Sequence, residues 1–150
     1  MIASPDPHNL VRFVRMHARD YEVALSELRA GSKRTHWIWY VLPQMRGLGL
    51  SKMSQIYGLA SLSEAEAYLA HPLLGARLRQ CVNILNEHAD TAAAQILGEV
   101  DAMKFRSCLT LFQAAAGPNS IFEEALNTFF HGEPDSNTLS LLARQGSKRE

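Results

Sequence analysis

The residues best suited to chemistry lie in one stretch, from Lys33 to Ser51, which reads KRTHWIWYVLPQMRGLGLS. The stretch holds both tryptophans of the chain, and cations, an imidazole and an amide lie within a few residues of them. Arginine and lysine bind anionic oxygens, and large aromatic faces stack on flat rings. The stretch therefore predicts a site for a phosphate attached to a flat ring. Its predicted ligand-binding residues are Lys33, Trp37, Trp39, Tyr40, Gln44 and Arg46.

The same stretch also fits a purely structural role. Trp37 and Tyr40 are three residues apart, so both can belong to the core of a helical protein. In that interpretation Lys33 and Arg34 are solvated, and His36 makes a hydrogen bond to a backbone carbonyl. The sequence leaves open whether this segment is a pocket wall or core.

A second group of polar residues lies near the start of a predicted long helix, where backbone N–H groups and the helix dipole favour anions. Asp101, Lys104 and Cys108 share one face of this helix by their spacing. If a pocket forms, we expect this helix start to face the aromatic stretch. The alternative is an internal ion pair between Asp101 and Lys104. Lys104, Arg106 and Ser107 complete the predicted ligand-binding set.

No familiar catalytic motif occurs in the sequence, since paired carboxylates, HExxH, GxSxG and Cys–His arrangements are all missing. Within the predicted site, His36 and Asp101 are the candidates for a catalytic acid or base. We predict no metal site and no cofactor, because the remaining histidines are scattered. Cys81 and Cys108 are isolated and are interpreted as buried thiols.

Composition predicts one globular domain, residues 1–146, followed by a frayed tail, residues 147–150. The chain has 150 residues, of which 47% are hydrophobic and 20% are charged. Fifteen basic residues balance fifteen acidic ones, which disfavours nucleic acid as a partner. No apolar run reaches the about 18 residues of a membrane span, and no signal peptide is evident, so we expect no membrane partner and a cytoplasmic location. The expected partner is a small anionic or nucleotide-like ligand, and the composition is compatible with a homo-oligomer.

Apolar residues recur at helical spacing, and Ser, Thr, Asp, Asn, Pro or Gly marks almost every boundary. This pattern predicts an all-α fold, a compact irregular bundle of eight or nine short helices. The central core helix is expected to run from Glu99 or Asp101 to Ala116, with Phe105, Leu109, Phe112 and Ala116 along one side.

The elements that must position the aromatic stretch are the first helices. We predict one helix ending at about Met16 and another from Asp20 to Gly31, with Arg12 and Glu27 solvated. The run HWIWYVL fits a buried helix or a strand, and we favour a short helix that ends before Pro43. Near the C-terminus, a helix is expected to start at Asp135 or Ser136 and to stop at Gly146.

Four segments carry a resemblance to a known family: DPHNLVRFV, ALSELRAGSKRTHWIWYVLPQMRGLG, SLSEAEAYLAHPLLGARLRQC and DAMKFRSCLTLF. The chain resembles, from Asp6 to about Leu142, an uncharacterised helical family found widely in bacteria, a domain-of-unknown-function family in which some members are labelled calpastatin. The resemblance implies an all-α single domain and no established activity. The calpastatin label does not suit this chain, because inhibitors of that type are disordered, whereas this sequence is apolar and capped throughout.

A more distant similarity links residues 61–78 and 101–106 to the helical NADAR group of glycosidases, which act on ADP-ribose and related nucleotides. That similarity implies an N-glycosidase in which a carboxylate, Asp101, Glu99 or Glu27, lies near the anomeric carbon. The acidic catalytic motif of the NADAR group has no match here. The competing hypothesis is a non-enzymatic protein-interaction module, in which the aromatic side chains form an exposed patch.

Overall fold

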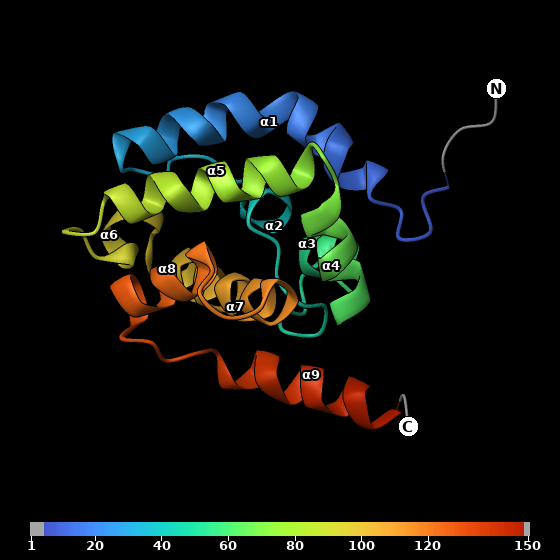
Figure 1. Cartoon of the computed structure of the whole chain (residues 1–150). Coiled ribbons are helices and arrows are strands. Elements are labelled where there is room, and N and C mark those ends of the chain that lie inside the picture. Colours follow the sequence, from blue (N-terminus) through green and yellow to red (C-terminus); the bar gives the residue numbers. More distant parts are fainter. Residues whose placement is uncertain (1–4, 149–150) are drawn as a thin grey trace.

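Helices account for nearly all the regular structure in the computed structural model, which describes residues 5–148 (Figure 1). Over that range the one pairing of β type is an isolated bridge between Met45 and Leu59. The predicted all-α fold is therefore confirmed. The helices are α1 (Val11–Ala30), α2 (Ile38–Val41), α3 (Lys52–Tyr57), α4 (Leu62–Ala70), α5 (Leu74–Glu87), α6 (Ala93–Leu97), α7 (Glu99–Ala116), α8 (Ile121–Phe130) and α9 (Ser136–Lys148).

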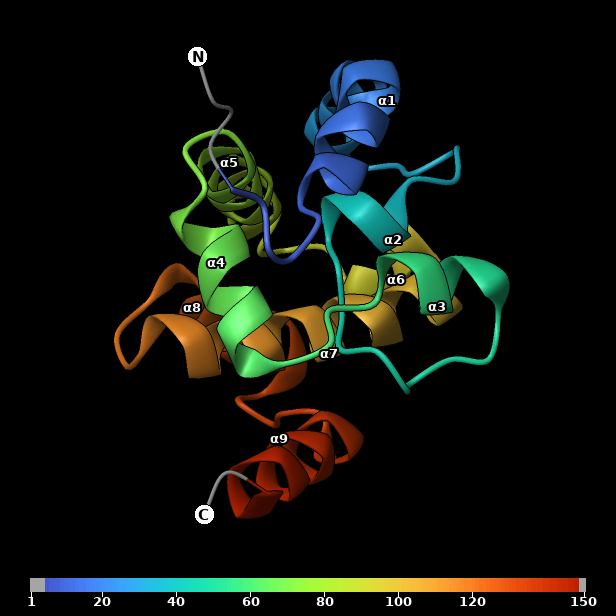
Figure 2. The same cartoon turned by 90° about the vertical axis from the view of Figure 1, so that its right-hand side faces the viewer.

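Helix α7 is the central element of one hydrophobic core. It contacts α4, α6, α8 and α9, and Figure 2 shows it crossing between α4 and α6 with α9 beneath. Phe105, Leu109 and Phe112 are completely buried, as predicted. Ala116 is exposed, because the helix runs past the core in its last turn. The remaining prediction for this helix, its span from Glu99 to Ala116, is confirmed.

Helix α1 is one continuous helix of 20 residues, where we predicted two. Its buried face continues through Phe13, His17, Tyr21, Ala24 and Leu28 without a break. The Asp20 side chain, which we predicted as a cap for the second helix, instead accepts hydrogen bonds from the Tyr40 hydroxyl and the Arg19 guanidinium. An unbroken apolar stripe outweighs the local signal of one possible capping residue. The predicted end at Gly31 is confirmed, at a φ of 71°.

The run HWIWYVL forms the short helix α2, as favoured, and most of it is core. Trp37 is 1% exposed and Tyr40 is completely buried. The Tyr40 carbonyl accepts hydrogen bonds from His17 Nε2 at 2.7 Å and from the Tyr68 hydroxyl at 3.2 Å. This carbonyl therefore joins α2 to α1 and α4 in the interior of the protein.

Arg12, predicted to be solvated, is a buried link between segments. Its five N–H groups all have acceptors: the carbonyls of Ile56, His8, Asn9 and Gly58, and Glu64 Oε1 at 2.6 Å. The Arg12 and Glu64 side chains are only 13% and 6% exposed. The pair ties the start of α1 to the end of α3 and to α4. Sequence spacing hides this role, because the three acceptors on other helices and loops, Ile56, Gly58 and Glu64, lie 44 to 52 residues away.

Glu27, also predicted to be solvated, holds the segment that leads into α2. Its carboxylate accepts hydrogen bonds from the backbone N–H of Arg34 and Thr35, the Thr35 hydroxyl and Trp37 Nε1. Partial burial raises the pKa of Glu27, but these hydrogen bonds have the larger, opposite effect and lower the pKa from 4.5 to about 2. The carboxylate thus fixes residues 34–37 against α1.

Acid is expected to destabilise the protein through His17, which is buried and stacked on Tyr21. Burial lowers the pKa of His17 from 6.5 to about 4, against the opposing effect of its hydrogen bond to the Tyr40 carbonyl, and with further lowering by Arg77 and His71. Because the unfolded chain then binds a proton more readily, stability is complete above pH 6.5 and falls as the pH drops towards 4. We expect a loss of about 2 to 3 kcal/mol between pH 7.5 and 4.5 from this group, at about 1.36 kcal/mol per pKa unit.

Urea unfolding of the wild type and His17→Gln at both pH values tests this expectation. The variant has no imidazole to titrate, so its stability should change less over the same interval. Equal pH dependence in both proteins would assign the acid sensitivity to other groups.

The C-terminal helix α9 begins as predicted, because the Asp135 carboxylate accepts hydrogen bonds from the Thr138 N–H and hydroxyl. It does not stop at Gly146 but continues to Lys148. Of the predicted frayed tail, residues 149–150 lie outside the described part of the chain. No helix between residues 5 and 148 is both long and apolar enough to span a membrane.

Candidate functional site

Five of the predicted site residues come together at the start of α7. Asp101 Oδ2 lies 2.7 Å from Lys33 Nζ, and Asp101 Oδ1 lies 3.4 Å from Lys104 Nζ. Each ammonium group also lies over an indole: Lys33 Nζ is 5.0 Å from the ring centroid of Trp37, and Lys104 Nζ is 5.6 Å from that of Trp39. The start of α7 therefore faces the aromatic stretch, as expected for a site. We call these five residues the lysine–tryptophan cluster.

Local backbone contacts position the cluster. The backbone N–H of Lys33 donates to the Ile96 carbonyl at 2.7 Å, which joins the segment after α1 to α6. Lys33 Nζ also donates to the Thr35 carbonyl at 2.5 Å. Helix α6 ends at Leu97, and α7 begins two residues later, so Asp101 is carried to the same place. The cluster is thus built by packing of α6 and α7 against the segment that Glu27 holds.

The lysine–tryptophan cluster has a net charge of one positive unit. Two ammonium groups share the single carboxylate of Asp101, and the indole faces add cation–π attraction of about 0.5 to 2 kcal/mol each. The predicted alternative, an ion pair between Asp101 and Lys104, is present. The shorter pair, however, joins Asp101 to Lys33, a contact that we did not predict.

Trp39 adds an unpaired donor to the cluster. Its indole Nε1 is buried and has no hydrogen-bond partner among the described residues. A buried donor without an acceptor costs about 1 to 3 kcal/mol.

The other predicted site residues lie elsewhere. The Tyr40 hydroxyl contacts Asp20 and the His36 carbonyl, on the side of α1. Arg106 donates to the Glu133 carbonyl beyond α8, and Ser107 donates to the Met103 carbonyl within its own helix. The structure therefore divides the predicted set. The predicted residues outside the cluster are His36, which is exposed, Gln44, which is buried, and Tyr40, Arg46, Arg106 and Ser107.

The two lysines lie over the indoles that were expected to form the wall of a pocket. Five surface cavities formed by residues 5–148 are lined by side chains outside the lysine–tryptophan cluster. Of the predicted residues, Arg46 lines one of them, a cavity of about 540 Å³ whose lining also includes Arg12 and Glu64. Because all N–H groups of the Arg12 side chain already have acceptors, Arg46 is the arginine of that cavity whose guanidinium remains available to a ligand.

The cysteines take no part in the cluster. Cys81 and Cys108 are free and buried, as predicted. Burial raises the pKa of the Cys81 thiol to about 12, which keeps it protonated and unreactive. Among the described residues, no three His, Cys, Asp or Glu side chains are grouped so that they could hold a metal ion.

Comparisons with known proteins point to one family. A family model described as a protein of unknown function (DUF1810) matches residues 7–142. The chain is similar to the crystal structure of the conserved hypothetical protein Rv1873 from Mycobacterium tuberculosis, with 44% sequence identity and a TM-score of 0.90. That match covers 92% of this chain and 99% of the other. No curated protein matches the sequence.

Proposed function

The chain belongs to the DUF1810 family of proteins of unknown function, and we propose that it binds a small phosphorylated or nucleotide-like ligand at the lysine–tryptophan cluster. The observation that carries this proposal is the sharing of Asp101 by Lys33 and Lys104, which leaves a local positive charge beside two indoles. Ammonium groups bind phosphate oxygens, and an indole face stacks on a base.

Lys104 is the cation best placed to bind the ligand. Its ion pair with Asp101 is the longer of the two, and its side chain is more exposed than that of Lys33. A phosphate oxygen could replace Asp101 as its partner while Lys33 keeps the carboxylate neutralised. Trp39, which is only partly buried, is the candidate for stacking, whereas Trp37 is enclosed in the core.

Binding is better supported than hydrolysis of an N-glycosidic bond. Both oxygens of Asp101 are engaged by lysines, so it could approach an anomeric carbon only after a ligand displaced one of them. Glu27 is occupied by four hydrogen bonds. His36 and Glu99 are exposed and are not among the ion-pair and cation–π partners of the cluster, so the enzymatic form of the proposal requires rearrangement.

Lys104→Met is expected to weaken ligand binding about tenfold or more, because a hydrogen bond to a charged group contributes about 1.5 to 3 kcal/mol. Titration calorimetry with pyrophosphate, AMP and ADP-ribose measures this change. Lys52→Met is the matched control, since Lys52 is an exposed lysine on α3. The control should bind as the wild type does.

Equal loss in both variants would mean that only overall charge matters. If none of the three compounds binds to the wild type, the proposal is wrong, and the protein-interaction module becomes the better hypothesis. One observation favours that second function: Val100 and Met103, on either side of Asp101 in α7, are 69% and 53% exposed. Light scattering on the wild type and Met103→Ser would then test for self-association through this surface.

A further inference from the structure

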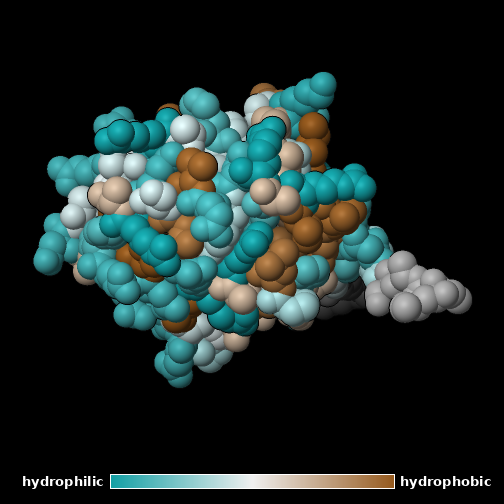
Figure 3. Space-filling view, turned by 90° about the horizontal axis from the view of Figure 1, so that it is seen from above, coloured by the Kyte–Doolittle hydropathy of each residue, from teal (hydrophilic) through white to brown (hydrophobic). Residues whose placement is uncertain are grey.

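Helices α1 and α5 lie side by side on one face of the protein (Figure 1). A shallow groove of about 700 Å³ runs between them. In Figure 3, which looks down on this face, hydrophilic side chains cover most of the surface and hydrophobic ones gather mainly on one side. None of the predicted site residues lines the groove. Its lining residues are Arg29, Ala76, Arg79, Gln80, Asn83, Ile84, Glu87 and His88.

Three polar side chains of the groove are oriented in advance by bonds to the fold. Gln80 Oε1 accepts a hydrogen bond from the Tyr21 hydroxyl at 2.6 Å, so the two donors of its amide remain for a ligand. His88 Nε2 donates a hydrogen bond to the Leu28 carbonyl at 2.9 Å. One N–H of the Arg79 guanidinium donates to the Leu69 carbonyl at 3.3 Å. Side chains held in this way lose little freedom when they bind a partner.

The order of the polar groups along α5 indicates which kind of partner would fit the groove. Arg79 and Glu87 are eight residues apart, which places them about 12 Å apart along the helix axis. The amides of Gln80 and Asn83 lie between them and can both donate and accept, as a peptide backbone requires. Arg29 of α1 adds a second guanidinium to the groove, so its formal charge is positive. Ile84, which is nearly buried, supplies an apolar floor.

From this arrangement we propose that the groove between α1 and α5 docks an extended acidic segment of a partner protein. At about 3.3 Å per residue, some four extended residues span the distance from Arg79 to Glu87. An acidic side chain of the segment pairs with Arg79, and its backbone bonds the amides of Gln80 and Asn83. Guanidinium groups favour carboxylates because two parallel N–H donors match their two oxygens.

A nucleic acid is a poorer fit to the same groove. It would need a continuous basic surface, whereas Glu87 interrupts this one and the whole chain has a net charge of zero. A small phosphate compound would need only one guanidinium and would not use the row of amides. The experiment therefore includes a phosphate probe, so that the two occupants give different results.

Fluorescence anisotropy at low salt, with a fluorescein-labelled peptide of four glutamates flanked by glycines, tests the proposal on the full-length protein. The peptide should bind, and the same peptide with glutamines should bind at least about tenfold more weakly. Arg79→Ala and Asn83→Asp should each weaken binding by up to about fivefold, the range typical of exposed charge pairs. Glu87→Gln should strengthen binding, because it removes the one repulsive carboxylate of the groove.

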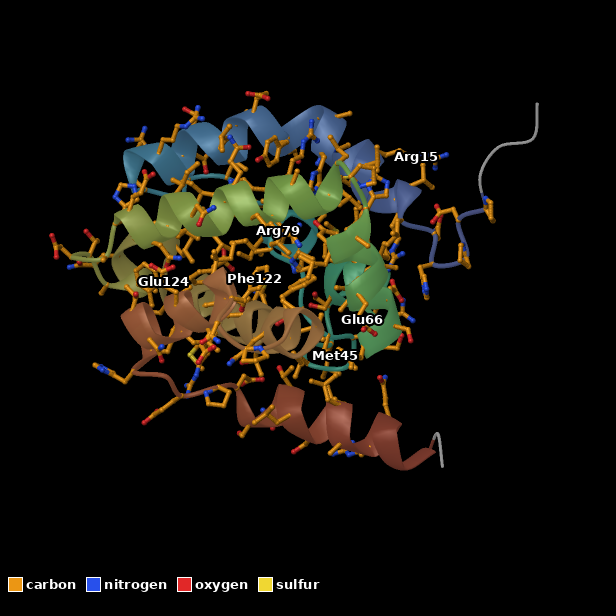
Figure 4. The ribbon with its side chains drawn as sticks, viewed as in Figure 1. Arg15, Met45, Glu66, Arg79, Phe122 and Glu124 are labelled. Carbon is orange, nitrogen blue, oxygen red and sulfur yellow. The ribbon has the colours of Figure 1, made fainter. Side chains whose placement is uncertain are left out.

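Arg15→Ala is the matched control for Arg79→Ala. Figure 4 shows Arg15 at the beginning of α1, while Arg79 lies along α5. Arg15 is exposed and does not line the groove, so its removal should leave peptide binding unchanged. Asn83→Asp guards against a folding defect in Arg79→Ala, since Asn83 is an exposed helix residue and needs no rearrangement.

Three results would overturn the proposal. Equal binding of the glutamate and glutamine peptides would show that acidic side chains are not recognised. If millimolar pyrophosphate displaces the peptide, and Arg79→Ala weakens the binding of pyrophosphate as much as that of the peptide, the groove would be assigned to a small phosphate ligand instead. Loss of peptide binding in Lys104→Met would place the peptide on the lysine–tryptophan cluster, so failure of this inference and failure of the proposed function remain distinguishable.

Discussion

Replacement of Arg12 by methionine is expected to destabilise the fold by about 3 to 5 kcal/mol, the cost of removing one partner of a buried ion pair. The variant would leave the Glu64 carboxylate, whose side chain is 6% exposed, with a single backbone donor, the Ala60 N–H. The carbonyls of Ile56, His8 and Gly58 would also lose the guanidinium donor that they share. The start of α1, the end of α3 and the start of α4 would then lose the side chain that links them.

Urea unfolding followed by circular dichroism measures this loss. Arg15→Met is the matched control on the same helix, and its stability should change by less than about 0.5 kcal/mol because Arg15 is exposed. The double variant Arg12→Met, Glu64→Met should recover part of the loss, since an apolar pair no longer leaves a charge unpaired. If the single variant is as stable as the control, the buried link contributes nothing and our interpretation of Arg12 is wrong.

Trp37→Ala is expected to destabilise the protein by about 3 to 5 kcal/mol, as large aromatic deletions in cores do. Trp37 is 1% exposed, and its Nε1 donates to Glu27 at 2.9 Å. The change would open a cavity and remove one of the hydrogen bonds that hold residues 34–37 against α1. Trp39→Ala should cost clearly less, because Trp39 is only partly buried and its N–H has no partner among the described residues.

The two tryptophan variants separate core from site. Thermal and urea unfolding should rank Trp37→Ala well below Trp39→Ala in stability, while ligand titration should show the larger loss of affinity in Trp39→Ala. Trp37→Phe serves as the control, since it keeps most of the buried volume and removes only the hydrogen bond to Glu27. The reverse ranking would mean that Trp39 supports the fold and Trp37 faces the ligand.

Much of the helical architecture could be predicted, because helix signals are local. The run of apolar residues in α7, the left-handed Gly31 that ends α1 and the Asp135 cap of α9 all lie within a few residues of the structure that they specify. The predicted break in α1 was wrong for a related reason. Asp20 has the chemistry of a cap, but a continuous apolar face over 20 residues decides in favour of one helix.

The roles of individual charged residues could not be predicted in the same way. Arg12 and Glu27 lie outside the apolar stripe of their helix, which is the usual signature of a solvated side chain. Their partners are Glu64, 52 residues along the chain, and the segment of residues 34–37. A spacing rule that looks three or four residues ahead cannot find partners brought together by the fold.

The sequence by itself determined that the chain is helical and that Asp101 and Lys104 are neighbours on one helix face. Only the tertiary structure decided that Lys33 completes this pair across 68 residues, that Trp37 belongs to the core, and that Tyr40, Arg46 and Arg106 face other parts of the protein. The physical reason is that helix formation depends on nearby residues. The composition of a site instead depends on which helix faces pack together.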